Sequence, residues 1–351
     1  MLFLFSFSFF GIISNSFASN SVLVDKLEKN SGWGVTVVDS ERSRVYVTNF
    51  KSDIVTVIDG ETNKQISEIK VGDSPYGIGL NTETKILYVA LERSNILAIV
   101  NSTSSEIIKN IELADPYDVA VNSNTNIVYI TSDQSGIVSV LNGSSNKIVS
   151  TLNVDKPCGI AVNEKTNMIY VTSETNNKLY VFDGKSNSLV GTVDVEKSPR
   201  GVIVNPNTNL VYVTNQLTGT VSVIDGSKNQ IIETISVEKT PRRIVVNPET
   251  NLLYVSNQIS NSLSVIDGFT NKVIDTIPVE QPYELILNPK TNKIYVSYFG
   301  YPTLSIVNDI MREPQQNNFQ IIIGVIIAGI GAAAVTFFIV QKKKTQVNPS
   351  T

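Results

Sequence analysis

The side chains best suited to chemistry in this sequence stand one or two residues after a proline. They are three arginines, three tyrosines and two carboxylates, namely Tyr76, Tyr117, Asp118, Arg200, Arg242, Arg243, Tyr283 and Glu284. Arginine binds carboxylate or sulfate groups through two parallel hydrogen bonds. Converging carboxylates, such as Asp118 with Glu284, can instead hold a divalent metal through oxygen ligands. These residues therefore allow an anion-recognition surface or a metal-dependent active site, provided that the fold brings them together.

The composition excludes several reaction classes. The 351 residues include no histidine and a single cysteine, Cys158. A Ser-His-Asp or Cys-His nucleophile and a histidine-held zinc, copper or haem are therefore impossible. The net charge of −4 gives no electrostatic reason to bind nucleic acid. We assign no catalytic residue, cofactor or metal ligand, and expect Cys158 to be a small buried hydrophobe.

The prolines belong to a repeat that runs through most of the chain. A Tyr-Val-Thr-Asn string recurs in variant form, in steps of 41 or 42 residues, at Tyr46, Tyr88, Tyr129, Tyr170, Tyr212, Tyr254 and Tyr295. An Asp or Asn follows each tyrosine by 13 residues, and a proline precedes it by 13 residues in every copy but the first, which has Trp33 there. A fixed period of this length is the signature of a repeat architecture.

Each copy has the pattern of four short strands. In the fifth copy these are residues 201–204, 210–214, 220–224 and 230–237. The turn cluster at 205–209 excludes a helix, and Asp225-Gly226 is a hairpin signal. Apolar residues fall on both faces of these strands, which is typical of strands buried on both sides. Four such strands in roughly 40–45 residues match one blade of a β-propeller.

The ends of the array predict how the ring closes. The seventh copy stops after Asn308 without a fourth strand, and residues 22–27 have the spacing of the missing one. We therefore expect residues 19–309 to form an all-β, seven-bladed propeller of four-stranded blades, closed by the N-terminal strand. The repeat tyrosines are expected to pack between blades, because they lie in the middle of strands buried on both faces.

The two termini carry apolar stretches outside the repeat. Residues 1–18 are uncharged and end in a small-residue cleavage pattern, which predicts a signal peptide, the alternative being an N-terminal membrane anchor. An uncharged stretch followed by three lysines predicts one membrane-spanning helix with a cytoplasmic tail. Small residues every fourth position of that helix could pair two copies weakly. The C-terminal parts are a linker at 310–318, the helix at 319–341 and the tail at 342–351.

The repeat resembles the YVTN family of β-propeller repeats, a WD-like repeat found in surface-layer proteins. The resemblance rests on the Tyr-Val-Thr-Asn core, the Asn-Pro-x-Thr-Asn turn before it and the Val-Ile-Asp-Gly turn after it, over roughly residues 21–309. It implies a cell-surface propeller that serves as a recognition or structural module. Related propellers in the wider superfamily include lactonases and lyases, and fold similarity does not transfer their activity.

The blade geometry predicts where a binding face would lie. The blade connections and the loops between second and third strands should form one face, called the top face here. The eight candidate residues should ring the channel mouth on that face. Charge around the ring is uneven: blades two to four carry the acids Asp73, Asp115, Asp118 and Asp155, and blades five and six carry the bases Lys197, Arg200, Lys239, Arg242 and Arg243. The alternative is that these are solvated loop charges of little energetic consequence. We expect the opposite, bottom face to look towards the membrane.

Two Asn-x-Ser/Thr sequons fall on turns of the bottom face. They begin at Asn101 and Asn142 and are candidate glycosylation sites. The alternative is that both asparagines are turn residues, because other copies carry Asp there.

The sequence thus favours a non-catalytic propeller on the cell surface, held in the cell membrane by one C-terminal helix. Its expected partners are a protein or glycan of the envelope, with no cofactor and no nucleic acid. The rival interpretation is an exported lactonase- or lyase-like enzyme with a divalent metal at the channel mouth. That interpretation requires convergent carboxylates at the channel mouth, such as Asp118 with Glu284.

Overall fold

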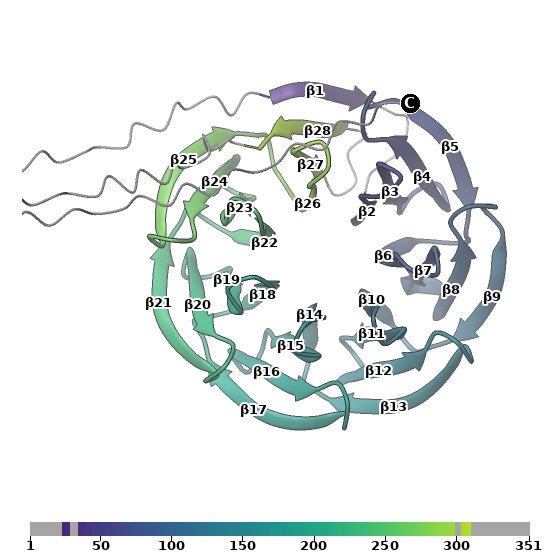
Figure 1. Cartoon of the computed structure of the whole chain (residues 1–351), viewed down its shortest axis with the longest axis horizontal. Helices are drawn as coiled ribbons and strands as arrows, with labels where there is room; N and C mark the ends of the chain where they lie inside the picture. Colours follow the sequence, from purple (N-terminus) through teal and green to yellow (C-terminus); the bar gives the residue numbers. More distant parts are fainter. Residues whose placement is uncertain (1–22, 29–33, 299–302, 310–351) are drawn as a thin grey trace, which may run out of the picture. The chain divides into compact units, whose positions relative to one another are not determined.

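Seven antiparallel sheets of four strands each are arranged around a common axis (Figure 1). The computed structural model describes residues 23–28, 34–298 and 303–309. The chain separates into two compact units, Met1–Arg312 and Glu313–Thr351, and all described residues belong to the first. The sheets follow one another along the chain as blades, so the seven-bladed, four-stranded propeller predicted from the repeat is confirmed.

The strand bounds follow the repeat closely, and one short 3₁₀ helix, η1 (Glu92–Ser94), interrupts blade 2. Blades 1 to 3 consist of β2 (Thr36–Asp39), β3 (Arg44–Asn49), β4 (Ile54–Asp59) and β5 (Gln65–Lys70); β6 (Pro75–Asn81), β7 (Ile86–Leu91), β8 (Ile96–Asn101) and β9 (Ile107–Glu112); and β10 (Pro116–Asn122), β11 (Ile127–Ser132), β12 (Ile137–Asn142) and β13 (Lys147–Asn153). Blades 4 to 6 consist of β14 (Pro157–Asn163), β15 (Met168–Ser173), β16 (Lys178–Asp183) and β17 (Ser188–Asp194); β18 (Pro199–Asn205), β19 (Leu210–Asn215), β20 (Thr220–Asp225) and β21 (Gln230–Ser236); and β22 (Pro241–Asn247), β23 (Leu252–Asn257), β24 (Ser262–Asp267) and β25 (Lys272–Pro278).

Blade 7 joins the two ends of the array. It consists of β26 (Glu284–Asn288), β27 (Lys293–Ser297), β28 (Thr303–Asn308) and, outermost, β1 (Leu23–Glu28). Strand β1 pairs antiparallel with β28, from Leu23 opposite Val307 to Glu28 opposite Thr303. The predicted closure by the N-terminal strand is therefore confirmed. It gives blade 7 its fourth strand, so β28 presents no unpaired edge to other chains.

The hydrophobic core lies between neighbouring blades. All seven repeat tyrosines are buried, with exposed fractions of 0–1 %. In the cluster between blades 4 and 5, Tyr170 and Val181 of blade 4 pack with Val202 and Val211 of blade 5. The tyrosines are thus inter-blade packing residues, as expected, and their side chains are not exposed to a ligand.

Polar side chains of the repeat also join each blade to the next. On the top face, Thr172 Oγ1 accepts a hydrogen bond from Gly159 N at 2.8 Å and donates to the Arg200 carbonyl oxygen of blade 5 at 2.8 Å. On the bottom face, Asn163 Nδ2 donates to Asn209 Oδ1 of blade 5 at 2.8 Å. These contacts fix the first strand of each blade, and therefore fix the residues that line the ring centre.

Several predictions concern residues beyond this part of the chain. The signal peptide at 1–18, the linker at 310–318, the helix at 319–341 and the tail at 342–351 lie outside the described residues. Within the described ranges, no helix has the length and apolar character needed to cross a bilayer.

Candidate functional site: the channel mouth

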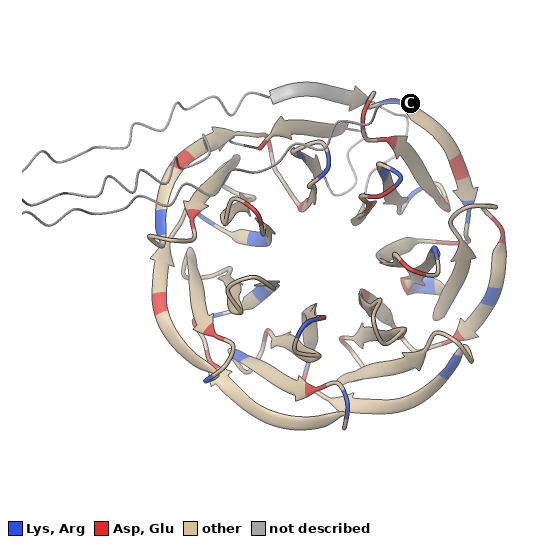
Figure 2. Cartoon of the chain, in the orientation of Figure 1, with Lys and Arg blue, Asp and Glu red and all other residues tan. Residues whose placement is uncertain are grey.

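The structure brings the eight candidate residues together at the inner ends of the first strands. On this face each first strand begins where the second strand ends, as Pro199 pairs with Asn215. We call this part of the top face the channel mouth; it is formed by Tyr76, Tyr117, Asp118, Arg200, Arg242, Arg243, Tyr283 and Glu284. Basic residues mark the inner ends of β18 and β22 (Figure 2).

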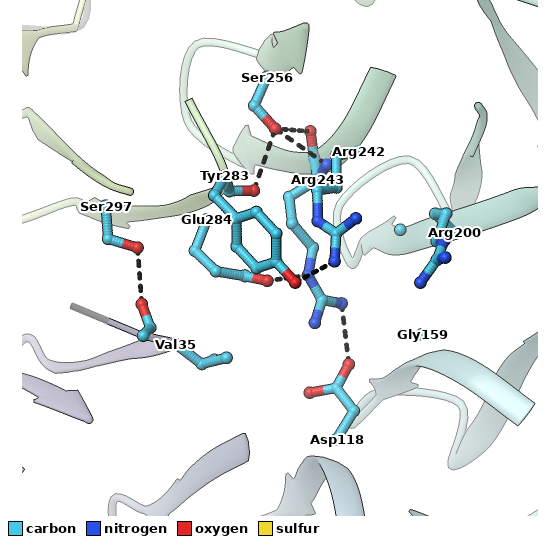
Figure 3. A network of polar contacts seen from close by, with 12 residues as sticks. Val35, Asp118, Gly159, Arg200, Arg242, Arg243, Ser256, Tyr283, Glu284 and Ser297 are labelled. Carbon is cyan, nitrogen blue, oxygen red and sulfur yellow. Dashed lines mark hydrogen bonds and ion pairs between the residues drawn. The ribbon is translucent and has the colours of Figure 1, made fainter. Parts of the chain in front are cut away.

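Arg243 joins three blades across the ring centre. Its Nη1 donates to Asp118 Oδ2 of blade 3 at 2.8 Å, and its Nε donates to Glu284 Oε1 of blade 7 at 2.5 Å (Figure 3). The side chains are 14 % exposed for Arg243, 9 % for Asp118 and 4 % for Glu284. Asp118 and Glu284 therefore do converge, but a guanidinium occupies the space between them. The alternative interpretation, that the charges of the mouth are solvated loop charges, is therefore wrong for these three residues.

Burial governs the electrostatics of this bridge. Loss of water raises the pKa of Glu284 above its usual value, while the nearby Arg243 acts in the opposite direction. Burial also opposes the charge of Arg243, but Asp118 and Glu284 hold its pKa well above the usual range. A buried bridge of this kind costs several kcal/mol when one partner is removed, because the remaining charge is left without compensation.

The three bridging residues all occupy the second position after the repeat proline, where other blades have glycine. Blades 2, 4 and 5 have glycine two residues after the proline, at Gly77, Gly159 and Gly201. A Cβ at these glycines would come within 2.1, 2.2 and 2.6 Å of a carbonyl oxygen of the next blade. The contact to the next blade is longer at two of the three larger residues. Thr131 Oγ1 lies 3.4 Å from the Cys158 carbonyl oxygen in the blade of Asp118, and Ser256 Oγ lies 3.3 Å from the Tyr283 carbonyl oxygen in the blade of Arg243, whereas Thr172 makes the same bond at 2.8 Å. In the blade of Glu284 the contact stays short, at 2.6 Å from Ser297 Oγ to the Gly34 carbonyl oxygen.

Three tyrosines close the side of the mouth that belongs to blades 2, 3 and 7. Tyr76 Oη lies 2.9 Å from both Tyr117 Oη and Tyr283 Oη. The rings of Tyr76 and Tyr117 stack with centroids 4.6 Å apart. Burial raises the pKa of Tyr76 and of Tyr117 well above the usual value. These hydroxyls are therefore neutral and serve as hydrogen-bonding groups.

Arg242 is the one arginine of the channel mouth that has no carboxylate partner among the described residues. Its guanidinium lies 3.6 Å from the centroid of the Tyr283 ring and donates to Tyr283 Oη. Within the described part of the chain it forms no ion pair with a carboxylate, and its buried Nε has no hydrogen-bond partner. A buried polar atom without a partner requires an explanation, such as a ligand or ordered water.

Arg200 lies beside a small cavity. It pairs with Glu174 at 3.1 Å, donates to Gln216 Oε1 at 3.0 Å and places Nη1 3.6 Å from Cys158 Sγ. The cavity has a volume of about 300 Å³ and is lined by Tyr117, Asp133, Lys156, Pro157, Cys158, Glu174 and Arg200. Burial raises the pKa of the Cys158 thiol. The thiol is therefore the small buried side chain that the sequence predicted, and its burial disfavours the thiolate form.

Sequence reasoning missed the loop residues of this cavity. Asp133 and Glu174 line the cavity and occupy the fourth position after the repeat tyrosine, where blade 2 carries Glu92 and blades 5 and 6 carry Gln216 and Gln258. Burial and the neighbouring carboxylates raise the pKa of Glu92 and of Asp133. The repeat itself held the signal, because equal spacing places these residues at equivalent points around the mouth.

The described residues offer no ready metal site. Across residues 23–28, 34–298 and 303–309, no group of three or more Cys, Asp and Glu side chains is placed to hold a metal ion. The two carboxylates that the metal interpretation required are both bound to Arg243.

The sequon asparagines begin turns on the bottom face. Asn101 Oδ1 accepts hydrogen bonds from Thr103 N at 2.8 Å and Ser104 N at 3.0 Å, and Asn142 caps its turn in the same way. This is the role that Asp183 has in blade 4. Both asparagines are thus turn residues in the structure, and their glycosylation stays a prediction.

Comparisons with known proteins agree with the fold. A family model described as "Lactonase, 7-bladed beta-propeller" matches residues 118–231, about a third of the chain. A search of curated proteins found no match. Among solved structures, hydrazine synthase of Kuenenia stuttgartiensis is similar, with a TM-score of 0.72 and 13 % sequence identity over 83 % of this chain and 99 % of that chain. The chain is therefore a seven-bladed β-propeller that resembles the lactonase propellers over blades 3 to 5.

Proposed function

We propose that this chain is a non-catalytic binding propeller, which recognises a protein or glycan partner of the cell envelope through its top face. The observation that carries the proposal is the Arg243 bridge. Metal-dependent chemistry at the mouth needs carboxylate oxygens that are free to act as ligands. Asp118 Oδ2 and Glu284 Oε1 instead accept hydrogen bonds from Arg243, and both side chains are almost fully buried.

The groups left at the mouth suit recognition. Arg200 and Arg242 present guanidinium groups, and Tyr117 lines the cavity beside Arg200. Binding sites commonly combine a concave apolar wall with a few fixed polar groups that set orientation. Arginine and tyrosine are also the residues that most often dominate binding energy at interfaces.

The proposal places the propeller outside the cell. Two segments support this placement. Residues 1–18 are apolar and have the pattern of a signal peptide, and residues 319–341 are uncharged and are followed by three lysines. Protease added to intact cells should then cleave the propeller but spare the tail.

The direct test is capture of envelope components by the purified full-length protein. The double variant Arg200→Gln/Arg242→Gln should capture less of the partner and unfold at nearly the same temperature. Arg243 is left unchanged, because removing it would expose two buried carboxylates to each other. Equal capture by the variant and the wild type would contradict the proposal.

The alternative is a lactonase-like enzyme, which the family match over residues 118–231 supports. It would need a divalent metal at the mouth and hydrolysis of a lactone. Thermal unfolding with and without Ca²⁺ or Mn²⁺, together with an assay on simple lactones, separates the two functions. Our proposal expects no metal-dependent rise in the unfolding temperature and no hydrolysis; both effects together would establish the enzyme.

A further inference from the structure

Blades 5 and 6 differ from the other blades at three equivalent positions of the top face. Directly after the proline they carry Arg200 and Arg242, where blades 2, 3 and 7 carry tyrosine. Two residues before the proline they carry Lys197 and Lys239, where the others have Asp73, Ala114, Asp155 and Glu280. Five residues after the repeat tyrosine they carry Leu217 and Ile259, where the others have Lys51, Arg93, Gln134, Thr175 and Gly300.

We call the top face of blades 5 and 6 the sector. The inner end of this sector has an arginine that an anionic ligand could pair with. Arg243 has two carboxylate partners and Arg200 has one, whereas Arg242 has none among the described residues. A partly buried cation without a counter-charge is costly, and a carboxylate from a ligand would compensate it. The guanidinium carbon of Arg242 lies 3.6 Å from the centroid of the Tyr283 ring, and the group donates to Tyr283 Oη, so it is held in place before a ligand arrives.

The outer end of the sector is apolar. Leu217 is 75 % exposed and Ile259 is 67 % exposed, the first at the tip of the loop after β19 and the second at the tip of the loop after β23. Leu217 N donates to the Lys197 carbonyl oxygen at 3.3 Å, which sets an aliphatic tip beside an exposed lysine. Glu196 and Glu238 are exposed next to the two lysines, so the sector is only mildly basic and Arg242 carries the charge preference.

We propose that the top face of blades 5 and 6 binds a polypeptide segment in which a carboxylate lies close to aliphatic side chains. The carboxylate binds Arg242, and the aliphatic side chains pack on Leu217 and Ile259. The two aliphatic tips favour a peptide over an acidic glycan, because sugar rings carry no branched aliphatic groups. This inference rests on the proposed function and names its ligand class.

The test is selection of a random peptide library, displayed on phage, against the immobilised full-length protein. Enriched peptides should carry Asp, Glu or a free C-terminus within a few residues of Leu, Ile or Val. A synthetic copy of the leading peptide should bind Arg242→Gln at least about tenfold more weakly than wild type, a loss of roughly 1.4 kcal/mol. Leu217→Ser/Ile259→Ser should weaken it by about three- to tenfold, and these exposed substitutions do not threaten the fold.

The matched control is Arg93→Gln, which removes an arginine from the top face of blade 2 and should leave the affinity unchanged. No enrichment, or enriched peptides that bind all variants alike, would overturn the inference. An Arg242-dependent affinity for glucuronate oligosaccharides, with none for peptides, would also overturn it while leaving the proposed function intact. If no substitution on the top face reduced the capture of envelope components, that result would instead count against the proposed function.

Discussion

The bottom face and the channel mouth are built from the same repeat, yet they differ in regularity. On the bottom face one contact recurs from blade to blade, since an asparagine Nδ2 donates to an asparagine Oδ1 of the next blade at 2.6–2.8 Å. The pairs are Asn81–Asn126, Asn122–Asn167, Asn163–Asn209 and Asn205–Asn251. At the mouth, the residues two after the prolines include three glycines, two acids and an arginine.

The difference teaches where folding and function reside in a repeat protein. Joining a blade to its neighbour is a demand that all copies share, and the asparagine pair meets it at four junctions. At the other junctions Asn247 donates to Asp309, Asn288 donates to Ser43 Oγ, and blade 1 has Asp39 at this position. A position that varies between copies is free of that demand, so its residues report on something specific to one blade. The following predictions test this division, and they run from the largest expected effect to the smallest.

Alkaline pH should unfold the propeller, because it ionises the tyrosines that the repeat places between blades. Burial raises the pKa of Tyr88, Tyr129, Tyr170 and Tyr212 to about 12, against 10.0 for an unperturbed tyrosine. The unfolded chain therefore loses these protons first, so the stability that they contribute is complete below pH 10 and is lost between about 10 and 12. Circular dichroism and tyrosinate absorbance should change together. If these tyrosines ionised while the propeller stayed folded, the result would count against their packing between blades.

Arg243→Met should lower the free energy of unfolding by about 3–5 kcal/mol, because it leaves Asp118 and Glu284 buried and unpaired. Urea denaturation measures the loss. The triple variant Asp118→Leu/Arg243→Met/Glu284→Leu removes the charges together and should recover most of it. The control Arg44→Met breaks the partly exposed pair with Asp59 and should cost at most about 1 kcal/mol. A similar cost for both single variants would mean that the bridge is not structurally important.

Asn205→Ala should cost about 1–3 kcal/mol, because Asn251 Oδ1 then loses its buried donor. The same variant should bind the partner as wild type does, since Asn205 lies on the face opposite the mouth. Chemical denaturation and titration of the same sample give both values. A change in affinity would show that the two faces are coupled.

Thr172→Val should cost about 0.5–1.5 kcal/mol, since it removes one hydroxyl contact between blades 4 and 5. Thr131→Val should cost less, because its bond to the Cys158 carbonyl oxygen is 3.4 Å long. The difference between the two midpoints in urea measures how much Asp118 has loosened its blade. An equal cost would remove that interpretation.

The fold was largely predictable from the sequence because the repeat is nearly free of insertions. The tyrosine spacing predicted the blades, and the strand-like segment before the first copy predicted closure by β1. Local alternation and turn residues carry this information, and they need no knowledge of long-range contacts.

The chemistry of the mouth was predictable only in part. The repeat offset identified all eight residues, but it grouped Arg243 with Arg200 and Arg242 as one basic surface. The structure separates them, because the Arg243 side chain reaches across the ring to Asp118 while Arg242 stacks on Tyr283. Which arginine finds an internal carboxylate depends on side-chain reach between blades 125 residues apart in sequence. Spacing along the chain does not encode that reach.

The central claim is that the varied residues of the mouth bind the partner while the repeated residues hold the ring. Isothermal titration of the selected peptide into Arg242→Gln and Asn205→Ala, with the unfolding midpoint of each, tests it most directly. The account predicts that Arg242→Gln loses about tenfold or more in affinity with a nearly unchanged midpoint, and that Asn205→Ala shows the reverse. Loss of affinity in Asn205→Ala, or full affinity in Arg242→Gln, would contradict it.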